Sequence, residues 1–322
     1  MRAIRPKKTS GSDGLELEDF PTPVPGAHQV MVRAEAIGVN FIDVYHRSGL
    51  YKTEMPIPLG VEGAGIIESV GSGVSDLAPG ERVAWSSAPG SYATHVVLDG
   101  ARAVPIPDGV DSRTAAALLL QGLTAHYLAR STFPLREGHT ALIHAAAGGV
   151  GLLLVQLAKA CGARVIGTVS NAEKAELAKG AGADHVIIYD GYGFLDQARE
   201  YTASRGVDVV YDSVGKATFD QSLEALAPRG YLVLFGQSSG PVPPIDPQRL
   251  AQRGSLFLTR PTLQHYTSTR PELLARASEL FELVLAGKLH VRIDREVPLA
   301  EAASAHRALE ARETRGKILL IP

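Results

Sequence analysis

The chain has 322 residues, of which 45% are hydrophobic and 20% are charged, and its formal net charge is −2 at pH 7. This length predicts two domains, and the near-neutral charge argues against nucleic acid or an anionic lipid surface as a partner. The single cysteine, Cys161, excludes an internal disulfide and a metal site of several thiolates, and it favours a cytoplasmic protein. The apolar stretches are too short to cross a bilayer and none follows the charged N-terminal segment, so we expect neither a membrane span nor a secretory signal.

The first part of the chain, residues 1–120, is predicted to be rich in β-structure. Short segments with many β-branched residues, bounded by Gly, Pro or Asp, occur at 30–37, 65–70 and 92–98. From about residue 122, apolar strands alternate with helical stretches. The predicted strands are 141–144, 164–169, 184–188, 207–211 and 231–235, and the predicted helices are 150–160, 172–179, 194–203 and 217–226. This alternation indicates a parallel sheet with crossover helices, after which we expect a helix over 272–286 and a strand over 318–321.

The first strand of this series runs into the turn Ala-Ala-Ala-Gly-Gly-Val-Gly at residues 145–151, followed by an apolar helix. This is a dinucleotide-binding turn in which alanine replaces the first glycine. Gly148 and Gly149 would let backbone N–H groups approach a pyrophosphate, Gly151 would let the helix pack closely, and the helix N-terminus favours negative charge. Tight strand-to-helix turns also use glycine for steric reasons alone. The strand–turn–helix context favours the nucleotide.

The end of the second strand indicates which nicotinamide cofactor is preferred. An NAD-binding chain carries an acidic residue about 20 positions past the glycines, whereas this strand ends in Ser170 and Asn171. Those two side chains can donate hydrogen bonds, and Lys174 supplies a positive charge one helical turn later. Lys174 could instead be an ordinary solvated lysine. The vacant acidic position favours NADPH.

Several motifs, in order and spacing, make the chain recognisable. They are Gly-Val-Asn-Phe-Ile-Asp (38–43), Arg-Ser-Gly-Leu-Tyr (47–51), Leu-Gly-Val-Glu-Gly-Ala-Gly (59–65), His-Ala-Ala-Ala-Gly-Gly-Val-Gly (144–151), Tyr-Asp-Ser-Val-Gly (211–215), Phe-Gly-Gln-Ser-Ser-Gly (235–240) and Thr-Arg-Pro (259–261). Together they resemble the medium-chain dehydrogenase/reductase superfamily and, within it, the quinone oxidoreductases, including the zeta-crystallins. The resemblance extends over essentially the whole chain.

The resemblance also predicts that the protein holds no zinc. In zinc-containing members a cysteine ligand stands where this chain has Asn40, and a histidine ligand stands where it has Val61. The lobe with four cysteines that binds structural zinc has no counterpart. A zinc site needs three or four ligands in tetrahedral array, so we expect no metal.

The fold that the resemblance implies is α/β, with a doubly wound parallel-sheet (Rossmann) nucleotide domain inserted in a mainly β, GroES-like catalytic domain. Residues 1–121 and 264–322 would form the catalytic domain, and residues 122–263 would bind NADPH in a cleft between the two. The resemblance further implies a homodimer, formed through edge strands of the nucleotide domains.

The resemblance places the cofactor contacts in both domains. The contacts implied for NADPH are Asn40, Phe41, Tyr45, Tyr127, Gly148, Gly149, Val150, Ser170, Asn171, Lys174, Tyr189, Ser213, Phe235, Gly236, Gln237, Ser238, Ser239, Gly240, Thr259, Arg260 and Arg312. Of these, Tyr127, Arg260 and Arg312 are the weaker assignments, because a lone arginine is usually a surface residue. Tyr189 could cover the adenosine or be an ordinary strand-end tyrosine. Gly236 and Gly240 could be turn glycines.

Asn40, Tyr45 and Tyr51 are the candidate catalytic residues. Asn40 would approach the nicotinamide but could also cap the helix that starts at Phe41, and Tyr45 or Tyr51 could line the acceptor pocket. The sequence offers no clear proton donor. His144, at the end of the first central strand, is best interpreted as a buried histidine whose hydrogen bonds are satisfied, so water could supply the proton.

These observations predict an NADPH-dependent, zinc-independent reductase of quinones. A quinone already accepts hydride, whereas alcohol oxidation requires loss of a hydroxyl proton, which a bound zinc assists. Conjugated enals and enones share the property of the quinone, so an enal or enone reductase is the first alternative. A nucleotide-binding protein without turnover, either a redox sensor or a structural protein, is the second.

Overall fold

The computed structural model describes residues 1–189 and 193–322. The chain forms two compact units. The first comprises Met1–Leu123 and Thr267–Pro322, and the second comprises Thr124–Tyr266.

The first unit is mainly β. Its strands are β1 (Arg2–Ala3), β2 (Glu18–Asp19), β3 (Gln29–Gly38), β4 (Glu62–Val70), β5 (Arg82–Trp85), β6 (His95–Asp99), β7 (Val104–Pro105), β14 (Ile293–Pro298) and β15 (Lys317–Ile321). Its helices are α1 (Phe41–Ser48), α8 (Arg270–Leu285), α9 (Ala302–Glu310) and most of α2 (Ser112–Tyr127), which runs across the division between the units. The main sheet has the order β14-β15-β3-β4-β5-β7, and β6 also pairs with β3.

Strand β3 organises the first unit because it pairs with three neighbours. Its side chains alternate between buried and more exposed positions over most of its length, as expected for a strand with one face on a core. The strand is antiparallel to both β4 and β15, in a register that sets Gly38 opposite Glu62 and next to Leu319. The starts of β4 and β15 therefore lie beside the end of β3, where the chain enters α1.

The second unit is a parallel α/β domain. Its strands are β8 (Thr140–Ile143), β9 (Arg164–Val169), β10 (His185–Ile188), β11 (Val207–Asp212), β12 (Leu226–Leu234) and β13 (Phe257–Thr259). Its helices are α3 (Gly149–Ala160), α4 (Ala172–Gly180), α5 (Phe194–Tyr201), α6 (Phe219–Glu224) and α7 (Gln248–Gln252). All the strand pairs are parallel, in the order β10-β9-β8-β11-β12-β13. The predicted fold class, a doubly wound sheet inserted in a mainly β domain, is confirmed.

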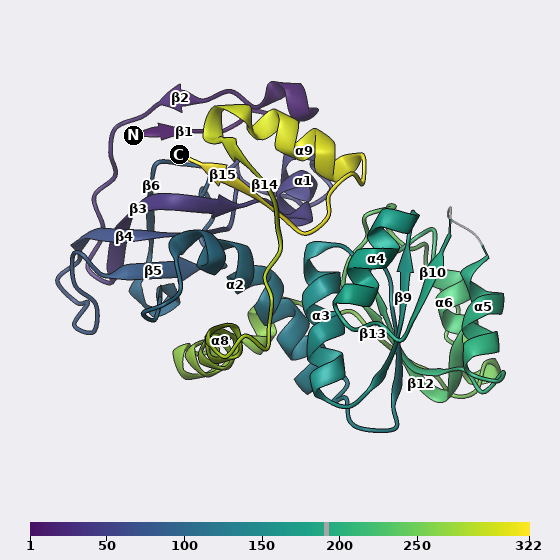
Figure 1. The fold of residues 1–322 in the computed structure, drawn as a ribbon. Coiled ribbons are helices and arrows are strands. Elements are labelled where there is room, and N and C mark those ends of the chain that lie inside the picture. The colour runs from purple at the N-terminus through teal and green to yellow at the C-terminus, as the bar shows by residue number, and fades with distance from the viewer. Residues whose placement is uncertain (190–192) are drawn as a thin grey trace. The chain divides into compact units, whose positions relative to one another are not determined.

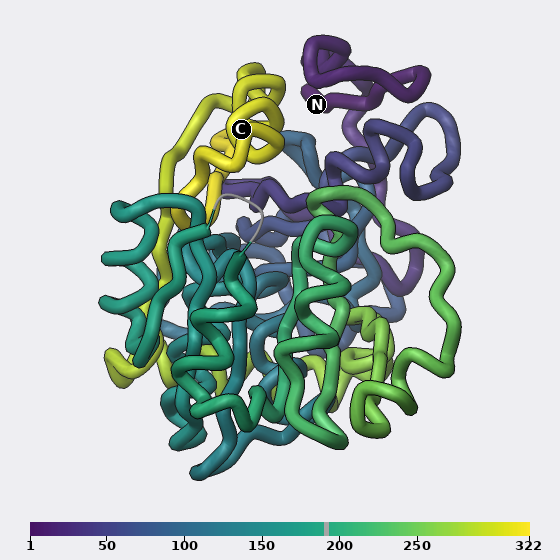
Figure 2. Tube along the Cα trace, turned by 90° about the vertical axis from the view of Figure 1, so that its right-hand side faces the viewer, coloured from purple at the N-terminus to yellow at the C-terminus, as the bar shows by residue number. Residues whose placement is uncertain are grey.

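The strand order reverses at β8, the central strand of the second unit. Helices α3 and α4 cover one face of the sheet, and α5 and α6 cover the other (Figure 1). After β12 the chain runs as a long segment without helix or strand over 235–247 before α7, seen in Figure 2 as an extended green tube. In such folds ligands bind outside the carboxyl ends of the strands where the order reverses, here between β8 and β11.

Two helices of the first unit were not predicted. The apolar stretch at 115–120, expected within the β-rich part, lies in the 16-residue helix α2. Ala115, Ala116, Ala117, Leu118 and Leu119 are all 0% exposed. This stretch is apolar on every side, so it lacks the 3.6-residue period that reveals a helix in sequence. Helix α9 lies between the predicted helix over 272–286 and the predicted strand over 318–321, where no element was predicted.

In the described part of the chain, no helix is both long enough and apolar enough to cross a membrane.

Candidate functional site

The turn after β8 has the geometry of an anion-binding loop. Ala145, the first residue of the turn, adopts φ +50°, a conformation that glycine reaches without strain. A Cβ on Gly151 would lie 2.3 Å from the Ala145 carbonyl oxygen, so the predicted need for close packing at Gly151 is confirmed. Gly148 is the N-cap of α3, and the next N–H groups lack intrahelical partners as in any helix. A phosphate fits this helix end.

His144, which precedes this turn, belongs to a buried polar network in the second unit. Its Nδ1 lies 2.9 Å from Thr168 Oγ1 and its Nε2 lies 3.0 Å from Ser222 Oγ, which in turn donates to Asp212 Oδ2 at 3.1 Å. Burial lowers the pKa of His144. The interpretation of His144 as a satisfied buried histidine is therefore confirmed.

The end of β9 presents polar side chains and no carboxylate at the strand tip. Ser170 and Asn171 are exposed, and Lys174 is half-buried in the first turn of α4. Asn171 is the N-cap of α4, and its Oδ1 accepts the backbone N–H of Lys174 at 2.9 Å. Because this bond uses the acceptor end of the amide, the Asn171 NH₂ group is the end left to donate to a ligand.

The loops after β11 and β12 are joined at the carboxyl edge of the sheet. The Ser238 N–H donates to the Ser213 carbonyl oxygen at 3.2 Å, and Ser239 Oγ donates to the Val214 carbonyl at 2.7 Å. A Cβ on Gly236 would lie 2.5 Å from the Ser213 carbonyl oxygen, so this glycine is required for the approach of the two loops. The structure thus brings Ser213 together with the predicted segment 235–240.

Arg260 joins this edge from β13. Its guanidinium donates to the carbonyl oxygens of Leu234 and Gly236, at 2.8 and 3.2 Å, and it follows Thr259 at the strand end. Tyr127 is 2% exposed, and its ring stacks on Tyr266 with centroids 4.3 Å apart. Arg260 and Tyr127 therefore have structural roles in the second unit, whatever else they contact.

Tyr189 follows β10 and is half-buried. Its ring packs edge-on against Phe194, with centroids 5.6 Å apart, and lies 6.3 Å from the His144 ring. The ring therefore stands beside the network that supports the turn, and its predicted contact with adenosine stays a prediction.

Three aromatic side chains of the first unit form a cluster on and after α1. Phe41 and Tyr45 are one helical turn apart, with ring centroids 6.1 Å apart, and Tyr45 lies 5.1 Å from Tyr51. All three are half-buried. The structure therefore brings together the predicted residues Phe41 and Tyr45, on α1, and Tyr51, after it. Arg312 follows α9 in the same unit and is exposed, with φ +58°.

Asn40 stands at the N-cap position of α1, but its side chain is directed into a buried ionic cluster. Its Oδ1 accepts from Lys317 Nζ at 2.8 Å, and its Nδ2 donates to Glu62 Oε2 at 2.8 Å. Weaker contacts join Nδ2 to the Gly38 carbonyl at 3.4 Å and Oδ1 to Gln121 Nε2 at 3.5 Å. Asn40 is 6% exposed. Its amide is thus engaged within the first unit, and its predicted contact with a nicotinamide stays a prediction.

A second buried chain of polar groups begins at Asp43. Asp43 Oδ2 accepts from the Asn40 N–H at 2.8 Å and from Tyr92 OH at 3.1 Å, and Tyr92 OH lies 3.0 Å from His306 Nε2. Arg47 contacts His306 Nδ1 at 3.0 Å and Glu310 at 2.6 Å. Burial raises the pKa of Asp43 to about 7 and lowers the pKa of His306 to about 3.

Sequence reasoning missed the residues that support Asn40. Glu62 lies within the motif at residues 59–65, but the motif does not show that its carboxylate contacts Asn40. Lys317 opens the otherwise apolar strand Lys-Ile-Leu-Leu-Ile, and a charge in such a run is the signal that could have found it. Asp43, Tyr92 and His306 offer no local signal.

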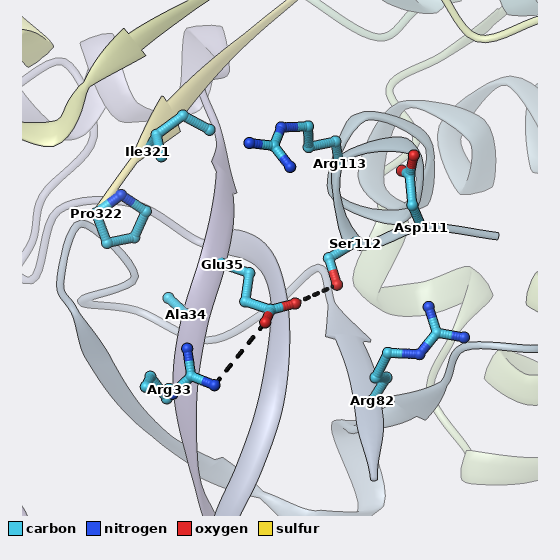
Figure 3. A pocket seen from close by; sticks show the side chains of 9 residues that line it. All are labelled: Arg33, Ala34, Glu35, Arg82, Asp111, Ser112, Arg113, Ile321 and Pro322. Atoms are coloured by element: carbon cyan, nitrogen blue, oxygen red, sulfur yellow. Dashed lines mark hydrogen bonds and ion pairs between the residues drawn. The ribbon is translucent and has the colours of Figure 1, made fainter. Parts of the chain in front are cut away.

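A cavity of about 460 Å³ lies elsewhere in the first unit. It is lined by Arg33, Ala34, Glu35, Arg82, Asp111, Ser112, Arg113, Ile321 and Pro322. Glu35 bridges Arg33 and Ser112 across it (Figure 3). None of the predicted site residues lines this cavity.

Asn40 and Val61 stand at the two positions where zinc-containing members carry metal ligands. Val61 is 7% exposed, and the Asn40 amide is hydrogen-bonded to Glu62 and Lys317. Within residues 1–189 and 193–322, no group of three or more His, Cys, Asp or Glu side chains is arranged to hold a metal ion. Independence from zinc stays a prediction.

Comparison with known proteins shows the family to which the chain belongs. Residues 149–282 match the family described as zinc-binding dehydrogenase, and residues 26–108 match the alcohol dehydrogenase GroES-like domain. The chain is 48% identical to a quinone oxidoreductase of Pseudomonas aeruginosa, over 97% of each chain, and 44% identical to a 2-haloacrylate reductase of Burkholderia, over 100% of this chain and 99% of the relative. The structure of Escherichia coli quinone oxidoreductase complexed with NADPH superposes with a TM-score of 0.98, at 42% identity and full coverage of both chains. The chain therefore belongs to the quinone oxidoreductases of the medium-chain dehydrogenase/reductase superfamily.

Proposed function

We propose that the protein is an NADPH-dependent, zinc-independent reductase of quinones. The observation that carries this proposal is the turn at 145–151, with Ala145 in the left-handed conformation and Gly151 against its carbonyl, placed at the strand-order reversal of a parallel sheet. Full-length relatives named quinone oxidoreductases support the acceptor.

The residues of the second unit fit a phosphorylated dinucleotide. Gly148, Gly149 and Val150 would hold the pyrophosphate at the start of α3, where N–H groups and the helix dipole favour negative charge. Ser170, the Asn171 NH₂ group and Lys174 would hold the 2′-phosphate. The other cofactor contacts proposed are Tyr127, Tyr189, Ser213, Phe235, Gly236, Gln237, Ser238, Ser239, Gly240, Thr259 and Arg260. Residues 122–263 would thus be the NADPH-binding domain.

The first unit would supply the acceptor end, with residues 1–121 and 264–322 as the catalytic domain. Phe41 and Tyr45 would contact the nicotinamide together with Asn40, and Tyr45 and Tyr51 would line the acceptor pocket. Half-buried aromatic rings offer flat apolar faces on which a planar quinone can stack. The bound cofactor supplies the hydride, so the protein mainly has to position the two reactants. Arg312 stays a weaker proposed contact.

The proton would come from water. His144 is unsuited as a donor because both of its ring nitrogens are engaged and burial lowers its pKa. A quinone already accepts hydride without a Lewis acid, so the proposed reaction needs no zinc.

Steady-state oxidation of NADPH with a panel of acceptors tests this function. We expect turnover with 1,4-benzoquinones and 1,4-naphthoquinones, and no detectable oxidation of ethanol or benzyl alcohol with NADP⁺. Exhaustive chelation should leave the rate unchanged. A rate that chelation abolishes and zinc alone restores would contradict zinc independence, and robust alcohol oxidation by metal-free protein would contradict the mechanism.

Replacing Lys174 tests the cofactor assignment. Lys174→Ala should weaken NADPH binding about ten- to a hundredfold and leave NADH binding nearly unchanged, as expected for a charge-assisted contact of about 1.5–3 kcal/mol. Lys179→Ala is the matched control, because Lys179 lies on the same helix in an exposed ion pair with Glu176. Fluorescence titration that shows equal losses for the two cofactors would refute the assignment.

A second candidate function is the reduction of conjugated enals or enones. The relative named 2-haloacrylate reductase, 44% identical over its full length, favours this candidate. Enone reduction without quinone turnover in the same panel would select it, and NADPH binding without any turnover would select a structural or sensing role. A homodimer in the cytoplasm stays a prediction, and light scattering tests the oligomeric state.

A further inference from the structure

A buried ion pair supports the start of α1. Lys317 and Glu62 contact each other, and both side chains are 0% exposed. Burying two charges carries a large desolvation cost, which only close pairing and additional hydrogen bonds offset. Here the additional bonds involve Asn40, which bridges the pair through Oδ1 and Nδ2 at 2.8 Å each.

The ion pair selects one orientation of the Asn40 amide. The oxygen and the NH₂ group of an asparagine have nearly the same shape, so packing alone distinguishes them poorly. In the observed orientation the amide oxygen faces the ammonium and the NH₂ group faces the carboxylate. Rotation by 180° would set like partial charges against each other at both ends. The two charges therefore fix a side chain that neutral partners would fix only weakly.

The same pair joins several segments of the first unit. Glu62 opens β4 and Lys317 opens β15, on either side of the end of β3. Glu62 Oε1 also accepts the backbone N–H of Leu120 in α2 at 2.6 Å. A Cβ on Gly38 would lie 2.3 Å from Glu62 Oε2 and 2.6 Å from Lys317 Cε, so the space around the pair is filled. The connection from β3 to α1 is thus held on several sides.

We propose that Lys317 and Glu62 are positioning residues, which hold Asn40 and the first turn of α1 so that Phe41 and Tyr45 keep a fixed place at the acceptor end. The pair itself does not touch substrate, because it has no exposed surface. This inference rests on the proposed function, which assigns Phe41 and Tyr45 to the nicotinamide.

The test uses the double variant Glu62→Gln with Lys317→Met in the full-length protein. It removes both charges together, keeps the approximate side-chain lengths and leaves an oxygen for the Leu120 N–H. We expect a melting temperature within about 5 °C of the wild type. We also expect kcat for a naphthoquinone to fall at least about tenfold. The NADPH dissociation constant should stay within about threefold, because the proposed phosphate contacts lie in the second unit.

The control double variant is Lys159→Met with Asp184→Asn. That pair makes a 2.8 Å contact in the second unit, but its side chains are 34% and 35% exposed. Its removal should leave kcat within about twofold of the wild type. Wild-type kcat in a folded Glu62→Gln, Lys317→Met variant would overturn the proposal, and so would an equal loss in the control.

Hydrogen exchange of the Asn40 side-chain amide, followed by NMR, provides a measurement that does not depend on turnover. The signal is assigned through its loss in Asn40→Asp. We expect the exchange to be at least about tenfold faster in the Glu62→Gln, Lys317→Met variant than in the wild type. Equal exchange rates would overturn the proposal even if no acceptor were found. A wild type that oxidises NADPH with no quinone would instead refute the proposed function.

Discussion

Glu62 in the first unit and Asp212 in the second are both carboxylates with 0% exposure, and they are stabilised in different ways. Glu62 is paired with an ammonium group, that of Lys317. Asp212 accepts instead from the backbone N–H groups of Val214 and Gly215, at 2.8 and 2.9 Å, and from the hydroxyls of Thr218 and Ser222, at 2.7 and 3.1 Å. Among the described residues, no Lys or Arg forms an ion pair with Asp212.

This difference follows from where the donors lie in the sequence. The four donors to Asp212 lie within ten residues of it, so the turn that follows β11 and the start of α6 form the whole site locally. Glu62 and Lys317 are 255 residues apart and meet only when β4 and β15 are placed beside β3. A buried carboxylate can therefore be stabilised by neutral donors close in sequence or by a cation distant in sequence. The second arrangement should be the more fragile, because loss of one partner leaves an isolated charge.

Lys317→Met alone should give the largest loss of stability. It leaves the Glu62 carboxylate buried without its cation, which we expect to lower the free energy of unfolding by about 3–5 kcal/mol. Adding Glu62→Gln should recover most of that loss. Urea unfolding of both variants measures the difference. A single variant as stable as the double one would show that charge pairing is not what matters at Glu62.

Asp43 is a third buried carboxylate and sharpens the comparison, because it has two donors and its Oδ1 has no partner among the described residues. Burial raises its pKa from 3.8 to about 7. Between those pH values the folded state holds a proton that the unfolded state has lost. The stabilisation is therefore complete below about pH 4 and is lost as the pH rises through 7.

Asp43→Asn removes this titration. As the pH rises from 5 to 8, the wild type should lose about 2–3 kcal/mol of its free energy of unfolding that the variant keeps. Urea unfolding of both proteins across this pH range measures the difference. The pKa of His306 is lowered from 6.5 to about 3, so its contribution changes with the opposite sign, but it is present in both proteins and cancels. A difference that does not change with pH would place the ionisation of Asp43 outside this range.

Asp212→Asn should have a smaller effect, a loss of about 1–2 kcal/mol. The amide oxygen can still accept from the Val214 and Gly215 N–H groups, and the NH₂ group can donate to the hydroxyls of Thr218 and Ser222, which can turn to accept. Thermal unfolding measures this variant beside Lys317→Met. A loss as large as that of Lys317→Met would remove the distinction between local neutral donors and a distant charge.

The smallest effect is expected for an exposed pair. Lys159→Met breaks the contact with Asp184. Desolvation raises the pKa of Asp184, but hydrogen bonds, including the one from Lys159, lower it overall. Because water solvates both groups, the loss should stay below about 1 kcal/mol. A larger loss on urea unfolding would show that exposure is not what separates this pair from Glu62 and Lys317.

The second unit could be predicted from sequence in more detail than the first. The turn at 145–151 and the alternating strands and helices around it are contiguous signals, and their physical meaning does not depend on distant residues. The support of Asn40 could not be predicted, because it depends on Glu62 and Lys317 meeting across the sheet. The motif indicated Asn40 as a candidate site residue, but the internal partners of its amide are known only from the folded chain.

The hydrogen bonds in the buried chain of polar groups between Arg47 and Asp43 all run in one direction. Arg47 can only donate hydrogen bonds, so His306 must accept at Nδ1, and its neutral ring then carries its proton on Nε2. That proton points to the Tyr92 oxygen, which leaves the Tyr92 hydroxyl hydrogen for Asp43. Each donor along the path thus faces inward from the protein surface, where Glu310 holds Arg47. Arg47 therefore sets the orientation of every proton on this path, and the path ends at the carboxylate that accepts the Asn40 N–H at the start of α1.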